Sequence, residues 1–158
     1  MAYTNIHPIK VTLGKSINYI CKFEKTGNGK YISSVNCQYQ IAEYEFEFTR
    51  KEKNDKVKML AFHAIQSFKK GELTADQAHE IGLETMKRML KGEYEFVIAT
   101  HVDSDCIHNH MVINSVNMIN GKSFSREHDR KKFPAWKEIR QISDEICREN
   151  NLQIIQEI

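Results

Sequence analysis

The sequence predicts an α+β fold in which helices cover a mostly antiparallel sheet. The first observation is the order of patterns along the 158 residues, which runs strand, helix, helix, strand, helix, strand, strand, helix, strand. The second is a pair of strand patterns, residues 94–101 and 108–118, joined by a short polar loop, as in an antiparallel hairpin. The third is composition, since 41% hydrophobic and 28% charged residues suit one globular core with a soluble surface.

The first elements are a strand and a short helix. Residues 6–12 alternate apolar and polar side chains, which predicts the strand. Residues 14–23 are expected to be helical because Leu13, Ile17 and Ile20 recur at helical spacing.

A loop and a second helix follow. The run TGNGK at residues 26–30 is a turn signal. Asn36 is a candidate cap for a helix over residues 38–53. Its inward face is expected to carry Ile41, Tyr44 and Phe48.

Residues 57–68 are apolar on both faces, which predicts a central strand. After a turn at residues 69–71, Thr74 and Gln77 have the spacing of a capping box and open the clearest helix, which should end before Gly92. Its buried face is expected to carry Ala78, Ile81, Thr85 and Met89.

The chain should close with the hairpin, a turn, a helix and a strand. Asn120-Gly121 is a turn signal, and Pro134 suits the first turn of a helix. The inward residues of that helix are expected to be Trp136, Ile139, Ile142 and Ile146. Residues 152–158 are a candidate closing strand.

Composition excludes several classes. The sequence contains no run of about 18 apolar residues, so no transmembrane helix is expected. Residues 1–12 lack the pattern of a secretory signal. The four cysteines form no C-x-x-C pair, so we expect free thiols in a reducing cytoplasm. The net charge of +2 does not by itself indicate a polyanionic partner.

Three histidines fall within ten residues, in the run HVDSDCIHNH. His108 and His110 are two apart on one strand and so share a face, and the hairpin brings His101 beside them. Three neutral imidazoles with open positions are typical of a catalytic divalent-metal site. A closed structural zinc site is the main alternative.

Two carboxylates and an amide lie near this cluster. Asp103 and Asp105, in the hairpin loop, are candidate additional ligands or acceptors that fix an imidazole tautomer. Asn114 shares the face of His108 and His110, where it would hydrogen-bond either a substrate or a loop.

The run HVDSDCIHNHMVINSVN, residues 101–117, resembles the metal motif of relaxases, the mobilisation nucleases of the HUH endonuclease superfamily. Residues 1–20 resemble the N-terminal motif of the MobP class, whose tyrosine corresponds to Tyr19. Residues 62–82 resemble the second motif, in which Ser67 matches a serine assigned to DNA contact, and residues 135–152 resemble the helix after the metal hairpin. These motifs occur in the family's order along nearly the whole chain.

The resemblance implies an antiparallel sheet of about five strands and a site- and strand-specific transesterification of single-stranded DNA at a transfer origin. Tyr19 would be the nucleophile that forms a covalent phosphotyrosine, and a metal held by the three histidines would bind the scissile phosphate. Tyr3 is the second candidate for the nucleophile. His7 and His63 are further candidates because some relatives use histidine.

Basic residues are concentrated in two regions, residues 1–32 and 122–140, which could line a DNA groove. The expected DNA contacts are Ser67, Gln66, Asn114, Lys10, Lys69 and Lys70.

Residues 1–158 are therefore expected to be a relaxase domain, the N-terminal fragment of a longer protein. We expect Mn²⁺ or Mg²⁺ as the working ion, with Ni²⁺ or Zn²⁺ able to occupy the isolated protein. The resemblance further implies a bacterial cytoplasmic protein of a plasmid or integrative conjugative element, with accessory relaxosome proteins and a type IV coupling protein as partners and no membrane insertion. The alternatives are an HUH replication initiator and a non-catalytic DNA-binding domain with a structural metal.

Overall fold

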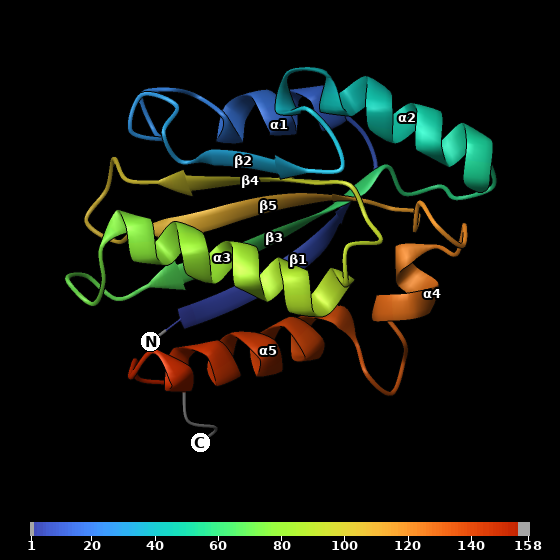
Figure 1. Ribbon diagram of the computed structural model, residues 1–158. Helices are drawn as coiled ribbons and strands as arrows, with labels where there is room; N and C mark the ends of the chain where they lie inside the picture. The colour runs from blue at the N-terminus through green and yellow to red at the C-terminus, as the bar shows by residue number, and fades with distance from the viewer. Residues whose placement is uncertain (1, 155–158) are drawn as a thin grey trace.

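The computed structural model describes residues 2–154, and its centre is one five-stranded antiparallel sheet with the strand order β1-β3-β5-β4-β2 (Figure 1). The strands are β1 (Ala2–Ile9), β2 (Ile32–Val35), β3 (Ala61–Phe68), β4 (Phe96–His101) and β5 (His108–Asn114). The helices are α1 (Leu13–Ile20), α2 (Ala42–Lys53), α3 (Ala75–Leu90), α4 (Phe124–His128) and α5 (Ala135–Glu149), and the 3-10 turn η1 (Tyr39–Ile41) precedes α2. The predicted α+β fold with a central antiparallel sheet is confirmed.

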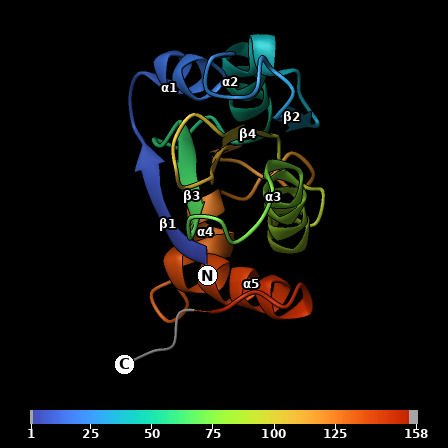
Figure 2. The ribbon, with the colours of Figure 1, turned by 90° about the vertical axis from the view of Figure 1, so that its left-hand side faces the viewer.

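Helices cover both faces of the sheet. Figure 2 shows α1 and α2 at one end of the molecule, α5 at the other and the strands between them. Ile17 and Ile20 of α1 pack in one cluster with Val112 of β5, whereas α3 and α5 pack against Met111 and Ile113. Because neighbouring strand residues point to opposite faces, the even-numbered side chains of β5 face α1 and α2.

The capping box of α3 is confirmed. Thr74 Oγ1 accepts a hydrogen bond from the Gln77 amide at 3.2 Å, and Gln77 Oε1 accepts one from the Thr74 amide at 2.9 Å. The predicted buried face is confirmed as well, because all four of its side chains are buried: Ala78, Ile81, Thr85 and Met89.

Several local predictions were wrong. The predicted inward residues of α2 are instead exposed, namely Ile41, Tyr44 and Phe48, and the helix buries Ala42 and Phe46 in their place. Trp136 is also exposed, although Ile139 and Ile146 of the same helix are buried as expected. The short elements β2 and α4 had not been predicted.

The predicted closing strand is absent from residues 152–154, and the rest of that prediction, residues 155–158, lies outside the described residues. Within residues 2–154, no helix combines the length and the apolar character that crossing a bilayer requires. All four cysteines are free, as expected, and burial raises the pKa of the Cys21 and Cys37 thiols to about 12.

Candidate active site

Three imidazoles converge where β4 ends and β5 begins. His101 is paired with His108 across the two strands, and His110 lies opposite Ala99 one step further along the same face. The ring centroids are 4.3 to 5.0 Å apart, and one nitrogen from each ring lies within 4.8 Å of the other two. The predicted convergence of His101, His108 and His110 is therefore present, and within residues 2–154 these three form the group of side chains that could hold a metal ion.

Each imidazole has one ring nitrogen engaged by the protein. His101 Nε2 lies 2.9 Å from the Ile20 carbonyl and His108 Nδ1 lies 2.9 Å from the Cys106 carbonyl. Because a carbonyl can only accept, both nitrogens must carry hydrogen, which leaves His101 Nδ1 and His108 Nε2 with free lone pairs.

The third imidazole is held by another histidine. His110 Nδ1 lies 2.8 Å from His63 Nε2 on β3. If His110 donates this hydrogen bond, its Nε2 is left free for a metal ion, as in metal sites where an outer partner fixes the tautomer. This contact was missed by sequence reasoning, although the alternation of β3 does place His63 on the same face as His110.

Burial favours the neutral form of His101, His110 and His63. It lowers the pKa of His110 to about 2, with the neighbouring imidazoles of His101 and His63 adding to the effect. Burial also lowers the pKa of His101, and it lowers that of His63 to about 4. Neutral imidazoles are the form that binds a cation, so the donor set suits a divalent metal.

A buried polar network lies on the opposite face of the same strands. Thr100 and Asn109, which pair with each other across β4 and β5, share a hydrogen bond of 2.6 Å from the Thr100 hydroxyl to Asn109 Oδ1. Asn109 Nδ2 in turn donates to Gln66 Oε1 at 3.0 Å and to the Ala78 carbonyl at 2.8 Å. These contacts tie together the strands and the helix directly behind the three histidines.

Tyr19 lies beside the cluster. Helix α1 buries Leu13, Ile17 and Ile20 and leaves Tyr19 49% exposed on its other side. The Tyr19 ring meets that of His101 edge-on, with centroids 6.1 Å apart. The carbonyl of the next residue, Ile20, is the one that His101 contacts, so the end of α1 is anchored on this histidine.

Two lysines surround the tyrosine. The amino groups of Lys22 and Lys25 lie 5.6 and 5.2 Å from the Tyr19 ring centroid. Lys25 also forms an ion pair with Asp103 at 3.2 Å. Positive charge therefore gathers at the mouth of the site, where an anionic substrate would enter.

The two loop carboxylates point to lysines and lie outside the group of potential ligands. The ion pair with Lys25 lowers the pKa of Asp103. Asp105 is strongly exposed and lies 3.6 Å from Lys70. The described structure thus gives both aspartates lysine partners and shows no contact between them and a histidine ring nitrogen.

The expected DNA contacts separate into two groups. Ser67 pairs with Tyr3 on one side and with His108 on the other, so it lies on the histidine face, half-buried. The side chains of Lys10, Lys69 and Lys70 are exposed.

Gln66 and Asn114 have internal roles and are not retained as DNA contacts. Gln66 is fully buried and donates to Thr85 Oγ1 and Ser143 Oγ. Asn114 is also fully buried, and it donates to the Phe46 carbonyl and to Glu95 Oε1. The polar side chain of Asn114 on an apolar strand is therefore explained by binding within the protein.

The alternative candidates for the nucleophile lie on β1 and β3. Tyr3 is 59% exposed on β1, and the His7 ring is 5.1 Å from that of His63. The structure therefore places Tyr3, His7 and His63 on the face of the sheet that also carries the three histidines.

Comparison with known proteins finds a matching family model and several similar proteins. A family model described as relaxase, MobA/VirD2-like, nuclease domain, matches residues 19–152. Two proteins named Protein rlx from Staphylococcus aureus are 34% and 37% identical over 98% and 99% of this chain, which corresponds to 44% of each relative. The group II intron-interrupted relaxase LtrB of Lactococcus lactis subsp. cremoris is 46% identical over 58% of this chain and 16% of its own length. The chain thus spans less than half the length of these relatives.

Proposed function

Because this chain belongs to the MobA/VirD2-like relaxase family, we propose that it nicks and rejoins one strand of single-stranded DNA at a transfer origin through a covalent bond to Tyr19. The observation that carries the proposal is the position of Tyr19, whose ring meets the His101 ring edge-on beside three converging imidazoles. A nucleophile and a phosphate-binding centre side by side are the two parts that this reaction needs.

His101, His108 and His110 would hold the divalent ion. Their converging ring nitrogens fit a cation such as Mn²⁺ or Mg²⁺, and imidazole ligands would also accept Ni²⁺ or Zn²⁺ in the isolated protein. When bound, the ion would supply positive charge to a nonbridging oxygen of the scissile phosphate. We assign Asp103 and Asp105 a supporting role only, through the lysines that they contact.

The proposed chemical step is a transesterification. The Tyr19 oxygen attacks phosphorus, its proton passes to solvent, and the bond from phosphorus to the 3′ oxygen breaks. The leaving strand takes up a proton and ends in a 3′-hydroxyl, while the other strand is joined to Tyr19 through its 5′ phosphate. The phosphodiester energy is kept in the protein–DNA bond, so attack by a 3′-hydroxyl can reseal the strand.

The chain's own residues prepare this step. The Ile20 carbonyl orients His101 and holds the end of α1 beside it, so the contact fixes the nucleophile and one metal ligand together. Lys22 and Lys25 carry positive charge near the tyrosine, where the phosphate would lie. Ser67, Lys10, Lys69 and Lys70 remain the proposed DNA contacts.

The wider setting belongs to the same proposal. Residues 1–158 would form a relaxase nuclease domain, and this chain spans 44% of the length of the two relatives named Protein rlx. The reaction would take place in the bacterial cytoplasm, where a plasmid or integrative element presents its transfer origin. Accessory relaxosome proteins and a type IV coupling protein are the partners that this activity would require.

A strand-cleavage assay tests the proposal. Labelled oligonucleotides that carry candidate origins are incubated with the protein and Mn²⁺, and both a shortened strand and a protein-linked strand are expected. A non-catalytic DNA-binding domain with a structural metal predicts binding without either product. A replication initiator would cut at a replication origin in preference to a transfer origin.

A further inference from the structure

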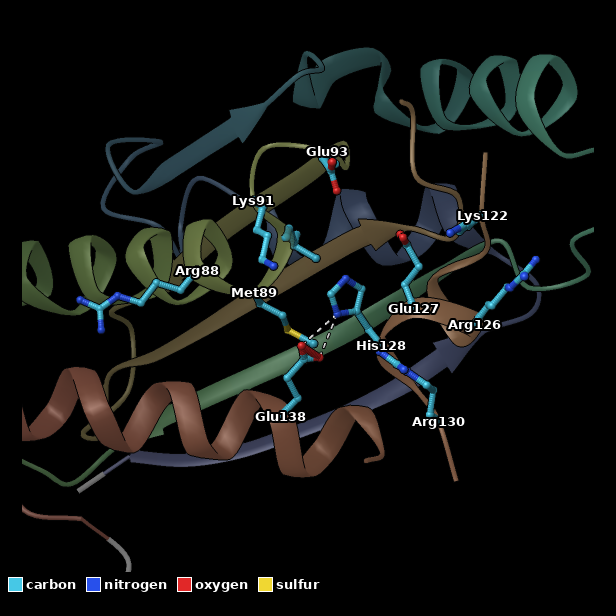
Figure 3. Close-up of a pocket in the computed structure, with 11 residues that line it drawn as sticks. Arg88, Met89, Lys91, Glu93, Lys122, Arg126, Glu127, His128, Arg130 and Glu138 are labelled. Atoms are coloured by element: carbon cyan, nitrogen blue, oxygen red, sulfur yellow. Dashed lines mark hydrogen bonds and ion pairs between the residues drawn. The ribbon is translucent and has the colours of Figure 1, made fainter. Parts of the chain in front are cut away.

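A basic cavity lies at the end of the sheet away from His101, His108 and His110. It has a volume of about 380 Å³ and is bounded by the end of α3, the segment after β5, α4 and the start of α5 (Figure 3). Five of the residues that line it are cationic: Arg88, Lys91, Lys122, Arg126 and Arg130.

The carboxylates of this cavity already have donors. Glu127 accepts hydrogen bonds from the Tyr94 hydroxyl at 2.5 Å, from Asn117 Nδ2 at 2.9 Å and from Asn120 Nδ2 at 3.1 Å. Both oxygens of Glu138 lie 2.9 to 3.0 Å from His128 Nδ1, the pair drawn with dashed lines in Figure 3. Glu93, the third carboxylate of the lining, accepts a hydrogen bond from Asn117 Nδ2 at 3.1 Å. The contacts of these three acids therefore involve none of the five lining cations.

Most of the cations lack an acidic partner. Arg88 is the exception, because it contacts Glu84 at 2.9 Å and Glu149 at 2.7 Å. Within residues 2–154, the other four are exposed and have no ion pair: Lys91, Lys122, Arg126 and Arg130. In Figure 3, Lys122, Arg126 and Arg130 lie together on one side of the cavity, with Lys91 across from them.

The cavity is distant from the candidate active site. Strand β5 begins at His108 and ends at Asn114, which separates its two ends by roughly 20 Å at about 3.3 Å per residue. The lining residues from Lys122 onward lie beyond that end, on the side of the sheet covered by α3 and α5. A ligand here would therefore be separate from the scissile phosphate that the proposed reaction places beside Tyr19.

We propose that this cavity binds the phosphate backbone of a second segment of the same DNA strand, at a distance from the scissile phosphate. The proposal rests on the proposed function, which supplies a long polyanion already held by the protein. Guanidinium groups bind phosphate through two parallel hydrogen bonds, which favours the arginine-rich rim as a phosphodiester site. A second contact on one strand adds affinity through the high effective concentration of the linked segment.

The experiment is a length series. Fluorescence anisotropy at low salt measures the affinity of single strands of six, 12 and 30 nucleotides for the wild-type chain and for a Lys122→Gln/Arg126→Gln variant. Both substituted side chains are exposed, so the fold should be kept. The matched control is Lys51→Gln/Arg148→Gln, which removes one exposed lysine and one exposed arginine away from the cavity and changes the net charge equally.

We expect wild type and control to gain affinity as the strand lengthens, and the cavity variant to lose about three- to tenfold on the 30-nucleotide strand. All three proteins should bind the six-nucleotide strand equally. An equal gain with length in the variant, or an equal loss at every length, would overturn the proposal. Cleavage of a short strand is scored separately, so failure of the proposed chemistry leaves the length series readable.

A further titration tests whether the cavity binds a small phosphate compound instead of DNA. A deoxynucleoside monophosphate is titrated into wild type and variant while amide chemical shifts are followed. Specific binding of the mononucleotide to the wild-type cavity, with no effect of the variant on the length series, would identify a nucleotide site and contradict the DNA proposal.

Discussion

His63 determines how the third imidazole of the cluster is oriented. Its Nε2 is 2.8 Å from His110 Nδ1, and outer partners of this kind typically affect metal affinity by 10- to 100-fold. We expect His63→Leu to weaken divalent-metal binding by about tenfold or more, and His63→Gln to recover part of the loss. Isothermal titration calorimetry with Mn²⁺ and Ni²⁺ measures both.

His7→Leu is the control for this prediction, because the His7 ring contacts His63 but has no hydrogen bond to His110. Its metal affinity should stay within about twofold of wild type. Normal metal binding by His63→Leu would show that the contact with His110 does not position the ring.

His108 is expected to be a direct ligand. Its Nδ1 is bound to the Cys106 carbonyl, which leaves Nε2 for the ion, so His108→Ala removes one of three donors. Calorimetric titration of the metal-free wild type should show one site, and the variant should bind at least about 100-fold more weakly. His128→Ala, whose imidazole contacts Glu138 at the far cavity, should bind metal normally. Unchanged binding by His108→Ala would remove it from the site.

Residue spacing was sufficient to predict the cluster but not its tautomers. The two-residue spacing of His108 and His110, together with a short hairpin, brings the three rings together from local sequence alone. The contacts that fix each ring come from other elements, such as Ile20 of α1 and His63 of β3, and local sequence does not encode those distances. The same limitation applies to Gln66, whose buried partners come from α3 and α5.

At the scale of elements, helix α3 packs closely against the sheet at Gly82. A Cβ atom added there would lie 2.5 Å from Ile98 Cδ1 and 2.6 Å from Asn109 Nδ2. Glycine to alanine in an exposed helix position stabilises by about 1 kcal/mol, but overpacking a core costs roughly 1–3 kcal/mol. We expect Gly82→Ala to lower the free energy of unfolding, measured by urea denaturation.

Gly14→Ala in α1 is the matched substitution. The added Cβ would meet the carboxylate end of Glu43, a flexible side chain that can move away. Its free energy of unfolding should therefore be unchanged or slightly higher. Equal effects of the two substitutions would contradict the close approach of α3 to the strands.

The predictions for elements succeeded where one pattern dominated. In α3 the cap and the apolar face agree, and both were confirmed. In α2 the aromatic residues fall on two sides, so spacing alone could not decide that Phe46 packs inward while Phe48 stays exposed. Strand β2 was missed because four residues with two central serines carry little signal without the β4 partner.

At the scale of the whole molecule, charge is distributed unevenly despite a net charge of only +2. Lys22 and Lys25 lie beside Tyr19, whereas Lys122, Arg126 and Arg130 line the cavity at the other end of the sheet. The sequence indicated two basic regions that could line a DNA groove, and the structure separates these three residues from the lysines beside Tyr19. The strand order, which separates them, depends on pairings between distant segments.

Binding to short single strands should depend on salt for this reason. Each phosphate neutralised on a single strand contributes about −0.7 to the slope of log affinity against log salt concentration. Two phosphate contacts, by Lys22 and Lys25, therefore predict a slope of about −1.4 or steeper. Anisotropy titrations from low to moderate salt measure it. An uncharged backbone analogue of the same sequence is the control, and a flat response with natural DNA would contradict the proposed groove.

The central claim is that Tyr19 attacks DNA beside the three-histidine site. Wild type and Tyr19→Phe are incubated with a transfer-origin oligonucleotide and Mn²⁺, resolved on a denaturing gel, and any DNA-linked peptide is mapped. The substitution removes one oxygen from a half-exposed side chain, so folding, metal binding and most DNA affinity should survive. We predict a wild-type adduct at Tyr19 and the joint loss of cleavage and adduct in the variant. An adduct retained by Tyr19→Phe, or one mapped to Tyr3, His7 or His63, would contradict the account.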